Sequence, residues 1–234
     1  MELKRYNDGE FGGCNTYVLK NKDSAIIIDA GVSLTNFIDD IKGLKIEGVF
    51  ITHAHFDHIY YLEGYLKELK ADLYISDLGY QKLYDSKKNM SAWFVEEEKE
   101  RKQKENIKNL SQDDFMKLLE NEEVSTNNED EKLEAIELID KYDYIPLIDG
   151  QEINLDNFKI KCVATPGHSC DSFTFIILDS AFVGDLIFAN GTGRTDFYDG
   201  NQDELMNSIK KLSKYSQIRK IHSGHGQSTR LKQK

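Results

Sequence analysis

The chain has 234 residues, a length typical of one large domain; 39% of them are hydrophobic and 30% are charged. Its formal net charge of −11 argues against nucleic acid and anionic membrane surfaces as partners, because both are held by a basic face. Three scattered cysteines, no apolar leader segment and no apolar run of about 20 residues predict a cytoplasmic protein without a disulfide framework. We therefore expect a small-molecule substrate, and a homodimer is one of the assemblies that the composition allows.

The first third of the chain alternates short hydrophobic runs with helical periodicity. Runs rich in β-branched and aromatic residues predict strands at 14–20, 24–31, 46–52 and 72–76. Apolar residues at helical spacing predict helices at 33–44 and 59–69. This alternation indicates an α/β fold.

Residues 79–141 have a different composition. The segment 96–110 is dense in charge and favours a helix, 111–120 begins like a capped helix at Ser111, and 121–132 is almost without apolar residues. We predict a charged helical insertion within a single domain that spans 1–234. The sequence leaves open whether this insertion is a lid, a dimer contact or a solvated helical hairpin.

After the insertion the strand pattern returns. A strand at 158–168 ends in a Pro-Gly turn, and 172–185 has the pattern of a hairpin. The segment 203–212 is an amphipathic helix, and a last strand at 218–226 ends in a glycine-flanked turn.

Half of the six histidines stand in the stretch THAHFDH, residues 52–58. If the strand continues, His53 and His55 point to the same face, and a turn after the strand brings Asp57 and His58 to the same centre. Further imidazole and carboxylate groups follow later strands, at His168, Asp185 and His225. These groups suit zinc, iron or manganese, and seven ligands are enough for two ions that share one carboxylate.

The segments THAHFDH, TPGHS, FVGDLIF and GHG, in this order, resemble the metallo-β-lactamase superfamily. The resemblance implies a four-layer αββα sandwich with two divalent ions, most naturally zinc, at one edge between the sheets. It assigns the ligands as follows: His53, His55 and His168 to the first ion, Asp57, His58 and His225 to the second, and Asp185 as the bridge.

Three features narrow the resemblance. Asp185 stands where the zinc β-lactamases of clinical resistance carry cysteine, which disfavours antibiotic hydrolysis. Residues 184–201 are similar to the corresponding loop of small hydroxyacylglutathione hydrolase (glyoxalase II) relatives. The sequence ends nine residues after His225, whereas full-length glyoxalase II enzymes continue into a helical domain that helps hold glutathione. The resemblance therefore does not extend to that part of glutathione recognition.

The function expected from these patterns is hydrolysis of a thioester or ester by hydroxide generated on the metal ions. Asp57 is the expected catalytic residue, which orients the nucleophile and moves a proton. A lactonase, a small phosphodiesterase and a one-iron sulfur dioxygenase use similar ligand sets and remain alternatives.

Several further residues have two interpretations each. Arg194 either holds a substrate carboxylate or pairs with Asp196. Tyr60, beside Tyr61, either offers a phenol to the substrate or packs at a helix base. Trp93, the only tryptophan, either caps a pocket or packs within the insertion.

Three residues near the ligands receive supporting roles. Asp29, at a strand end, is expected to orient a ligand histidine. His222 is expected to pack in the core, and Cys170 to be an inert thiol.

Overall fold

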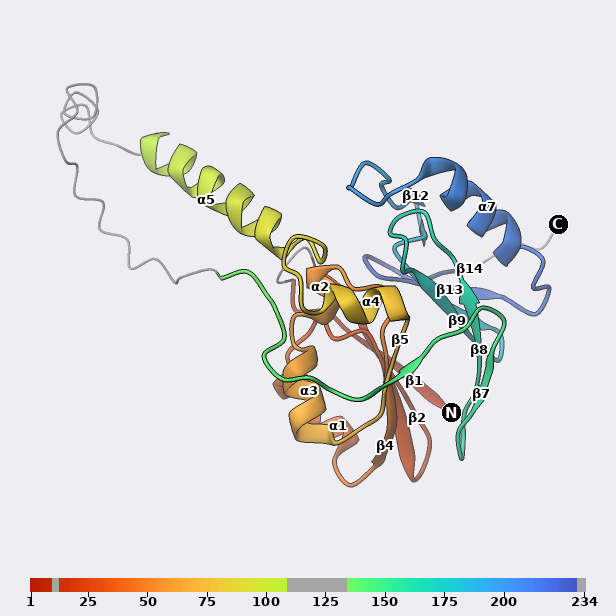
Figure 1. Ribbon diagram of the computed structural model, residues 1–234. Helices are drawn as coiled ribbons and strands as arrows, with labels where there is room; N and C mark the ends of the chain where they lie inside the picture. The colour runs from red at the N-terminus through yellow and green to blue at the C-terminus, as the bar shows by residue number, and fades with distance from the viewer. Residues whose placement is uncertain (10–12, 109–133, 231–234) are drawn as a thin grey trace, which may run out of the picture.

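The computed structural model describes residues 1–9, 13–108 and 134–230, and in these ranges two six-stranded sheets pack face to face (Figure 1). The first sheet has the order β1 (Glu2–Tyr6), β2 (Thr16–Lys20), β3 (Ser24–Ile28), β4 (Lys45–Phe50), β5 (Leu73–Ile75) and β6 (Tyr144–Pro146). The second has the order β14 (Thr229–Arg230), β13 (Lys220–Ser223), β10 (Ser180–Gly184), β9 (Phe173–Ile177), β8 (Lys159–Ala164) and β7 (Glu152–Asn154). A small ribbon pairs β11 (Ile187–Phe188) with β12 (Gly191–Thr192).

Helices cover the outer faces of both sheets. Those of the N-terminal half are the 3₁₀ turn η1 (Leu34–Asn36), α1 (Ile38–Ile41), α2 (Phe56–Ile59), α3 (Leu62–Leu69) and α4 (Asp77–Lys82). This half also contains α5 (Ser91–Lys108), which covers neither sheet. In the C-terminal half, α7 (Gln202–Leu212) packs on the second sheet. The architecture is the αββα sandwich expected from the sequence. No helix of the described ranges combines the length and apolarity needed to cross a lipid bilayer.

Three hydrophobic layers hold this sandwich together. Strand β3 shows why its sequence is apolar without alternation: Ile27 packs under the helices, whereas Ile26 and Ile28 point between the sheets. Between the sheets, Phe50 from β4 meets Phe175 from β9, with ring centroids 5.4 Å apart. Burying these large side chains on both faces is the main source of stability of the two-sheet body.

Two helices predicted from the sequence have different bounds in the structure. The segment 33–44 is not one helix, because the backbone at Phe37 (φ −145°, ψ 6°) separates η1 from the single turn of α1. The segment 59–69 forms the helix α3 only from Leu62, because the backbone at Tyr61 (φ −101°, ψ 7°) is not helical and separates α3 from α2. The expected hairpin at 172–185 is present as β9 and β10, which turn at Leu178 in the left-handed region (φ 54°).

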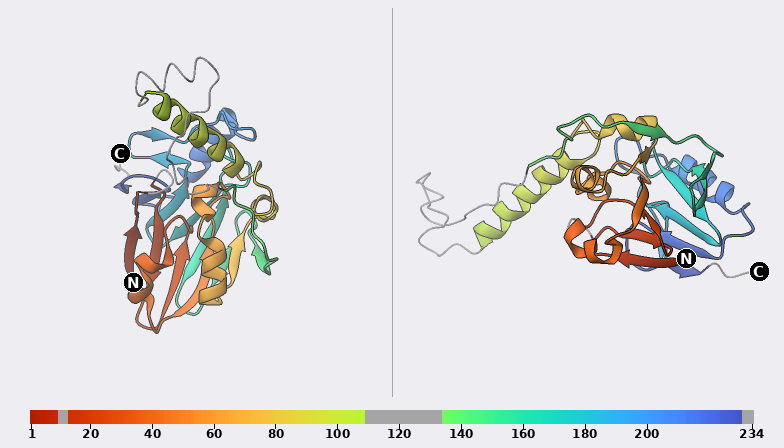
Figure 2. Two further views of the ribbon diagram at one scale, coloured as in Figure 1. Left: turned by 90° about the vertical axis from the view of Figure 1, so that its left-hand side faces the viewer. Right: turned by 90° about the horizontal axis from the view of Figure 1, so that it is seen from below.

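In the expected insertion, the structure describes α4, α5 and an irregular return path to β6. Helix α5 extends away from the two-sheet body, as Figure 1 and the right-hand view of Figure 2 show. The predicted helix at 111–120 and the polar stretch at 121–132 lie outside the described residues.

Candidate metal centre

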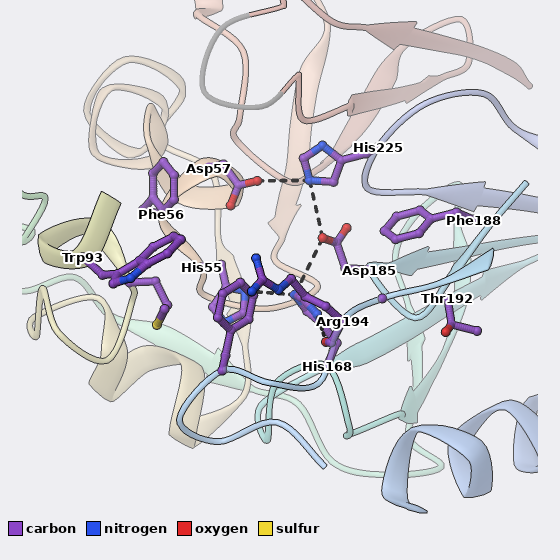
Figure 3. Close-up of a pocket in the computed structure, with 13 residues that line it drawn as sticks. His55, Phe56, Asp57, Trp93, His168, Asp185, Phe188, Thr192, Arg194 and His225 are labelled. Carbon is purple, nitrogen blue, oxygen red and sulfur yellow. Dashed lines mark hydrogen bonds and ion pairs between the residues drawn. The ribbon is translucent and has the colours of Figure 1, made fainter. Parts of the chain in front are cut away.

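The seven residues singled out in the sequence come together at one edge of the sandwich (Figure 3). Strands β8, β10 and β13 run in the same direction, so that their carboxyl ends meet at one edge of the second sheet. Each is followed by one candidate ligand: His168, Asp185 and His225. The segment after β4 joins this edge through a hydrogen bond from the Phe173 N–H to the Thr52 carbonyl (2.8 Å).

The ligand atoms form overlapping groups rather than one cluster. In each group the ligand atoms lie within 4.8 Å of one another, and the groups are His53, His55 and His168; His53, His58 and Asp185; and Asp57, His58 and His225. The first and third groups match the two ligand sets implied by the sequence resemblance.

The Asp185 carboxylate lies between these groups. Its Oδ2 is 3.6 Å from Nε2 of His168 and 3.4 Å from Nε2 of His225. Its Oδ1 is 3.4 Å from Nε2 of His58. One carboxylate therefore faces imidazoles of both groups, as a bridging ligand must.

Several atoms of the centre lack the partners that buried polar atoms require. Nε2 of His53, Nε2 of His58 and Oδ1 of Asp185 are buried without a hydrogen-bond partner. Nε2 of His168 and Nδ1 of His55 face each other at 3.0 Å, so one of the two must carry a proton unless a cation lies between them. A divalent ion removes both costs, because it accepts several lone pairs at once. The residues present thus fit metal ions, and the nitrogen and oxygen donors suit zinc, iron or manganese.

Supporting hydrogen bonds orient the imidazoles, and they include the one expected for Asp29. Its carboxylate accepts from Nδ1 of His58 (2.8 Å) and from the N–H (2.7 Å) and hydroxyl (2.9 Å) of Thr52. On the other side, Nδ1 of His168 lies 2.8 Å from the Arg194 carbonyl, which acts as the acceptor. Both contacts leave Nε2 as the metal-facing nitrogen.

The histidines of the centre have pKa values shifted in opposite directions. Burial lowers the pKa of His53 well below its ordinary value and that of His55 to about 3. Burial also opposes charge on His225, but hydrogen bonds to Asp185 and Asp57 raise its pKa to about 10. Without a metal, the second group therefore holds a proton that an ion must displace.

The sequence patterns missed a buried ionic network behind the first group. The Lys82 ammonium donates to Ser169 Oγ (2.6 Å), Asp171 Oδ1 (2.5 Å) and Asp199 Oδ2 (2.6 Å). The other oxygen of Asp171 accepts from the N–H of Ala54 (2.8 Å), the residue between two ligand histidines. No local motif could reveal this network, since its members are spread over four segments of the chain.

The network also explains a further group of candidate ligand atoms. Cys170, Asp171 and Asp199 bring ligand atoms within 4.8 Å of one another. The ammonium of Lys82 already lies against both carboxylates, and burial raises the pKa of the Cys170 thiol to about 12. We therefore assign no ion to this group.

A cavity of about 380 Å³ opens onto the ligands (Figure 3). It is lined by the candidate ligands His55, Asp57, His168, Asp185 and His225 and by Phe56, Met90, Trp93, Phe188, Thr192, Gly193, Arg194 and Phe197. The start of the expected insertion thus supplies part of the wall.

The two residues proposed to contact substrate differ in position. Arg194 lines the cavity, but its guanidinium holds Asp196 through two hydrogen bonds of 2.7 Å. Tyr60 is not among the lining residues, and its ring packs against Tyr61 with centroids 4.9 Å apart. His222 stacks on Phe182 (4.7 Å between centroids), which confirms its expected packing role.

Comparisons with known proteins place this centre in a family. The chain is 29% identical over 221 residues to a probable metallo-hydrolase, YqgX, of Bacillus subtilis (strain 168), covering 92% of this chain and 86% of that protein. It is 37% identical over 87 residues to the hydroxyacylglutathione hydrolase GloC of Haemophilus influenzae, covering 36% of this chain and 41% of GloC.

Solved structures and family profiles agree with these relatives. The crystal structure of BLEG-1 B3 metallo-β-lactamase has the same fold, with a TM-score of 0.73, 24% identity and coverage of 98% of this chain and 94% of that one. The family described as the metallo-beta-lactamase superfamily matches residues 9–219. The chain therefore belongs to the metallo-β-lactamase superfamily and is a metallo-hydrolase of that family.

Proposed function

We propose that this protein is a binuclear metal-dependent hydrolase that cleaves thioesters or closely related esters. The observation that carries the proposal is the position of Asp185, whose carboxylate faces both His168 and His225 and so suits a bridge between two ions. We assign His53, His55 and His168 to one ion and Asp57, His58 and His225 to the other, with zinc as the first choice and iron or manganese as alternatives.

The residues of the two ligand groups would hold the ions, and the chemistry supplied there would be a more acidic water and polarisation of a substrate carbonyl. The remaining work belongs to the chain. Asp57 lies in the first turn of α2 and lines the cavity, and its Oδ2 is 3.0 Å from Nε2 of His225. We assign to this carboxylate the orientation of the attacking water and the transfer of its proton. Asp171 and Lys82 hold the ligand loop in place through the N–H of Ala54.

Two observations support a thioester rather than another acyl compound. The aligned part of GloC, a hydroxyacylglutathione hydrolase, covers about a third of this chain. The loop 184–201, which follows the bridging Asp185, is similar to that of the same enzyme group and lines the cavity with Phe188, Arg194 and Phe197. A lactone or phosphodiester would meet the same ligands, so the choice is tested directly.

The test loads the purified protein separately with zinc, manganese and iron(II), counts bound ions by native mass spectrometry, and assays S-D-lactoylglutathione together with a neutral thioester. We expect two ions and thioester hydrolysis. Asp57→Ala should retain the first ion, weaken the second and lower turnover at least a hundredfold. Asp156→Asn, an exposed carboxylate on the far side of the body, is the control and should change neither.

Each competing function predicts a distinct result. One bound iron with oxygen consumption on a persulfide would replace the proposal with a sulfur dioxygenase. Two ions with cleavage of lactones, phosphodiesters or a β-lactam, and no thioester turnover, would keep the centre and reject the substrate class. Full activity and two ions in Asp57→Ala would reject the role of Asp57.

A further inference from the structure

The cavity wall beside the ligands is apolar. Its five apolar side chains come from the ligand loop, the start of α5 and the loop after Asp185: Phe56, Met90, Trp93, Phe188 and Phe197. In Figure 3, Trp93 and Phe56 lie on one side of the ligands and Phe188 on the other. A group attached to a carbonyl at the ligands would therefore contact aromatic rings.

The start of α5 is fixed to the ligand loop. The N–H of Phe56 donates to the Asn89 carbonyl (2.8 Å), and the Phe56 ring stacks on Phe94 with centroids 4.4 Å apart. The Asn89 side chain donates to the Ile136 carbonyl (2.7 Å), which anchors the same turn from the return path. Trp93 is thus held at the cavity by a packed turn, although most of α5 extends away from the body.

Phe197 lies over the rings of the first ligand group. Its centroid is 5.3 Å from that of His55 and 5.7 Å from that of His168, in both cases nearly perpendicular. Trp93 stands 6.0 Å from Phe197, also edge to face, and 37% of its surface is exposed. A large, half-exposed indole beside a reaction centre gains stability when an apolar ligand covers it.

The guanidinium of Arg194, beside this wall, does not give the wall a net positive charge that would attract an anion. Arg194 is neutralised by the two-bond pair with Asp196, and its guanidinium lies 4.4 Å above the Phe197 ring. Arg194 therefore acts as a cover for Phe197 and adds no net charge. The wall presents aromatic surface and a neutral ion pair to the substrate.

We propose that Trp93, Phe56 and Phe197 form a binding subsite for an uncharged aromatic group attached next to the scissile carbonyl. The preferred substrates are then aryl-bearing thioesters or esters rather than small hydroxyacyl ones. This inference rests on the proposed function only for the position of the carbonyl; the subsite itself is a property of the cavity wall.

A binding experiment tests the subsite without turnover. Trp93 is the only tryptophan of the chain, so its fluorescence reports on this wall alone. Zinc-loaded protein is titrated with phenylacetate and with acetate, whose carboxylates meet the ions equally. We expect phenylacetate to change the Trp93 emission and to bind at least tenfold more tightly than acetate, with most of the difference lost in Phe197→Ala. Equal affinities would overturn the proposal.

A kinetic experiment then places the aromatic group. Three substrates are compared: S-phenylacetyl-N-acetylcysteamine, S-acetyl-N-acetylcysteamine and S-phenyl thioacetate, which carry the ring on the acyl side, on neither side and on the leaving group. The S-phenylacetyl compound should have a kcat/KM at least tenfold above that of the S-acetyl compound, and Trp93→Ala should reduce this ratio about tenfold. For S-phenyl thioacetate only the change of kcat/KM in Trp93→Ala is compared, because its thiophenolate leaves more easily whatever the protein contacts. Met206→Ala, an exposed apolar residue of α7, should leave the ratio unchanged.

The two experiments separate the two proposals. Selective phenylacetate binding without any thioester hydrolysis would retain the subsite and reject the proposed function. Hydrolysis of the S-phenylacetyl and S-acetyl compounds at similar rates, with equal binding of both acids, would retain the function and reject the subsite.

Discussion

Lys82 and Asp199, which are 117 positions apart in the sequence, form a largely buried ion pair with 2.6 Å between Nζ and Oδ2. The same ammonium contacts Ser169, directly after the ligand His168, and Asp171, which binds the N–H of Ala54. One lysine from α4 therefore connects the two loops that carry the first ligand group with the loop that carries Phe197. These contacts fix the positions of the three loops relative to one another.

Replacing Lys82 should lower the free energy of unfolding substantially. Lys82, with 3% of its side chain exposed, is the positive partner of two carboxylates, and Lys82→Met leaves both buried without it. We expect a loss of about 3–5 kcal/mol in the free energy of unfolding, measured by urea denaturation of the metal-free protein. Lys67→Met, which removes the surface ion pairs of Lys67 with Glu63 and Asp140, should cost less than about 1 kcal/mol. Similar losses in the two variants would contradict this role.

The carboxylate of Asp29 should control metal affinity more than folding. Its backbone is in the left-handed region (φ 60°), which asparagine tolerates, so Asp29→Asn keeps the chain path. The variant has one acceptor oxygen where Asp29 uses two, so its contact with Nδ1 of His58 competes with those to Thr52. We expect affinity for the second ion to fall about 10–100-fold, measured by competition with a chromophoric chelator. Unchanged affinity would show that His58 needs no such partner; Asp179→Asn, at the exposed hairpin turn, is the control.

The metal-free protein should be most stable near pH 6.5. His225 has a folded pKa of about 10, above the ordinary 6.5, so its contribution is complete below pH 6.5 and is lost as the pH rises toward 10. His55 has a folded pKa of about 3, so the unfolded chain alone takes up that proton as the pH falls below 6.5. Thermal unfolding across pH 5 to 8.5 tests this maximum. Stabilisation by added zinc should grow with pH over the same range, because the ion displaces the proton on His225; a zinc effect independent of pH would contradict the competition.

Gly224 should tolerate no side chain. A Cβ at this position would lie 2.1 Å from Oδ1 of Asp185 and 2.6 Å from Cε1 of His58. Gly224→Ala should therefore displace the bridging carboxylate and lower the number of bound ions, as counted by native mass spectrometry. Gly64→Ala, in the open interior of α3, should instead raise stability by about 1 kcal/mol and keep the metal content. Two fully bound ions in Gly224→Ala would show that the edge can rearrange.

The sequence predicted which side chains come together at the candidate metal centre better than it predicted the bounds of the helices around it. The spacing in residues 52–58 and the glycines beside Asp185 and His225 are local signals, and family resemblance supplied the rest. Helix bounds were less accurate, because the breaks at Phe37 and Tyr61 arise from packing against the first sheet, which local periodicity does not encode.

The residues that the sequence did not reveal act across long distances. Lys82 is one lysine among many, and only the tertiary fold shows that it faces Asp171 and Asp199. Edge strands such as β1 and β14 are short and polar, so their sequences resemble loops. The pairing of Arg194 with Asp196 could be predicted from the sequence, because the two residues are only two positions apart.

The order of the ligands along the chain affects when a metal can be acquired. During synthesis the four candidate ligands from His53 to His58 leave the ribosome well before His168, Asp185 and His225, which follow strands of the second sheet. A chain with only the first set offers an ion a weak, exchangeable site, since the bridging Asp185 is still missing. Tight metal binding would then require the two sheets to dock first, because only docking brings His168, Asp185 and His225 to the residues that follow β4.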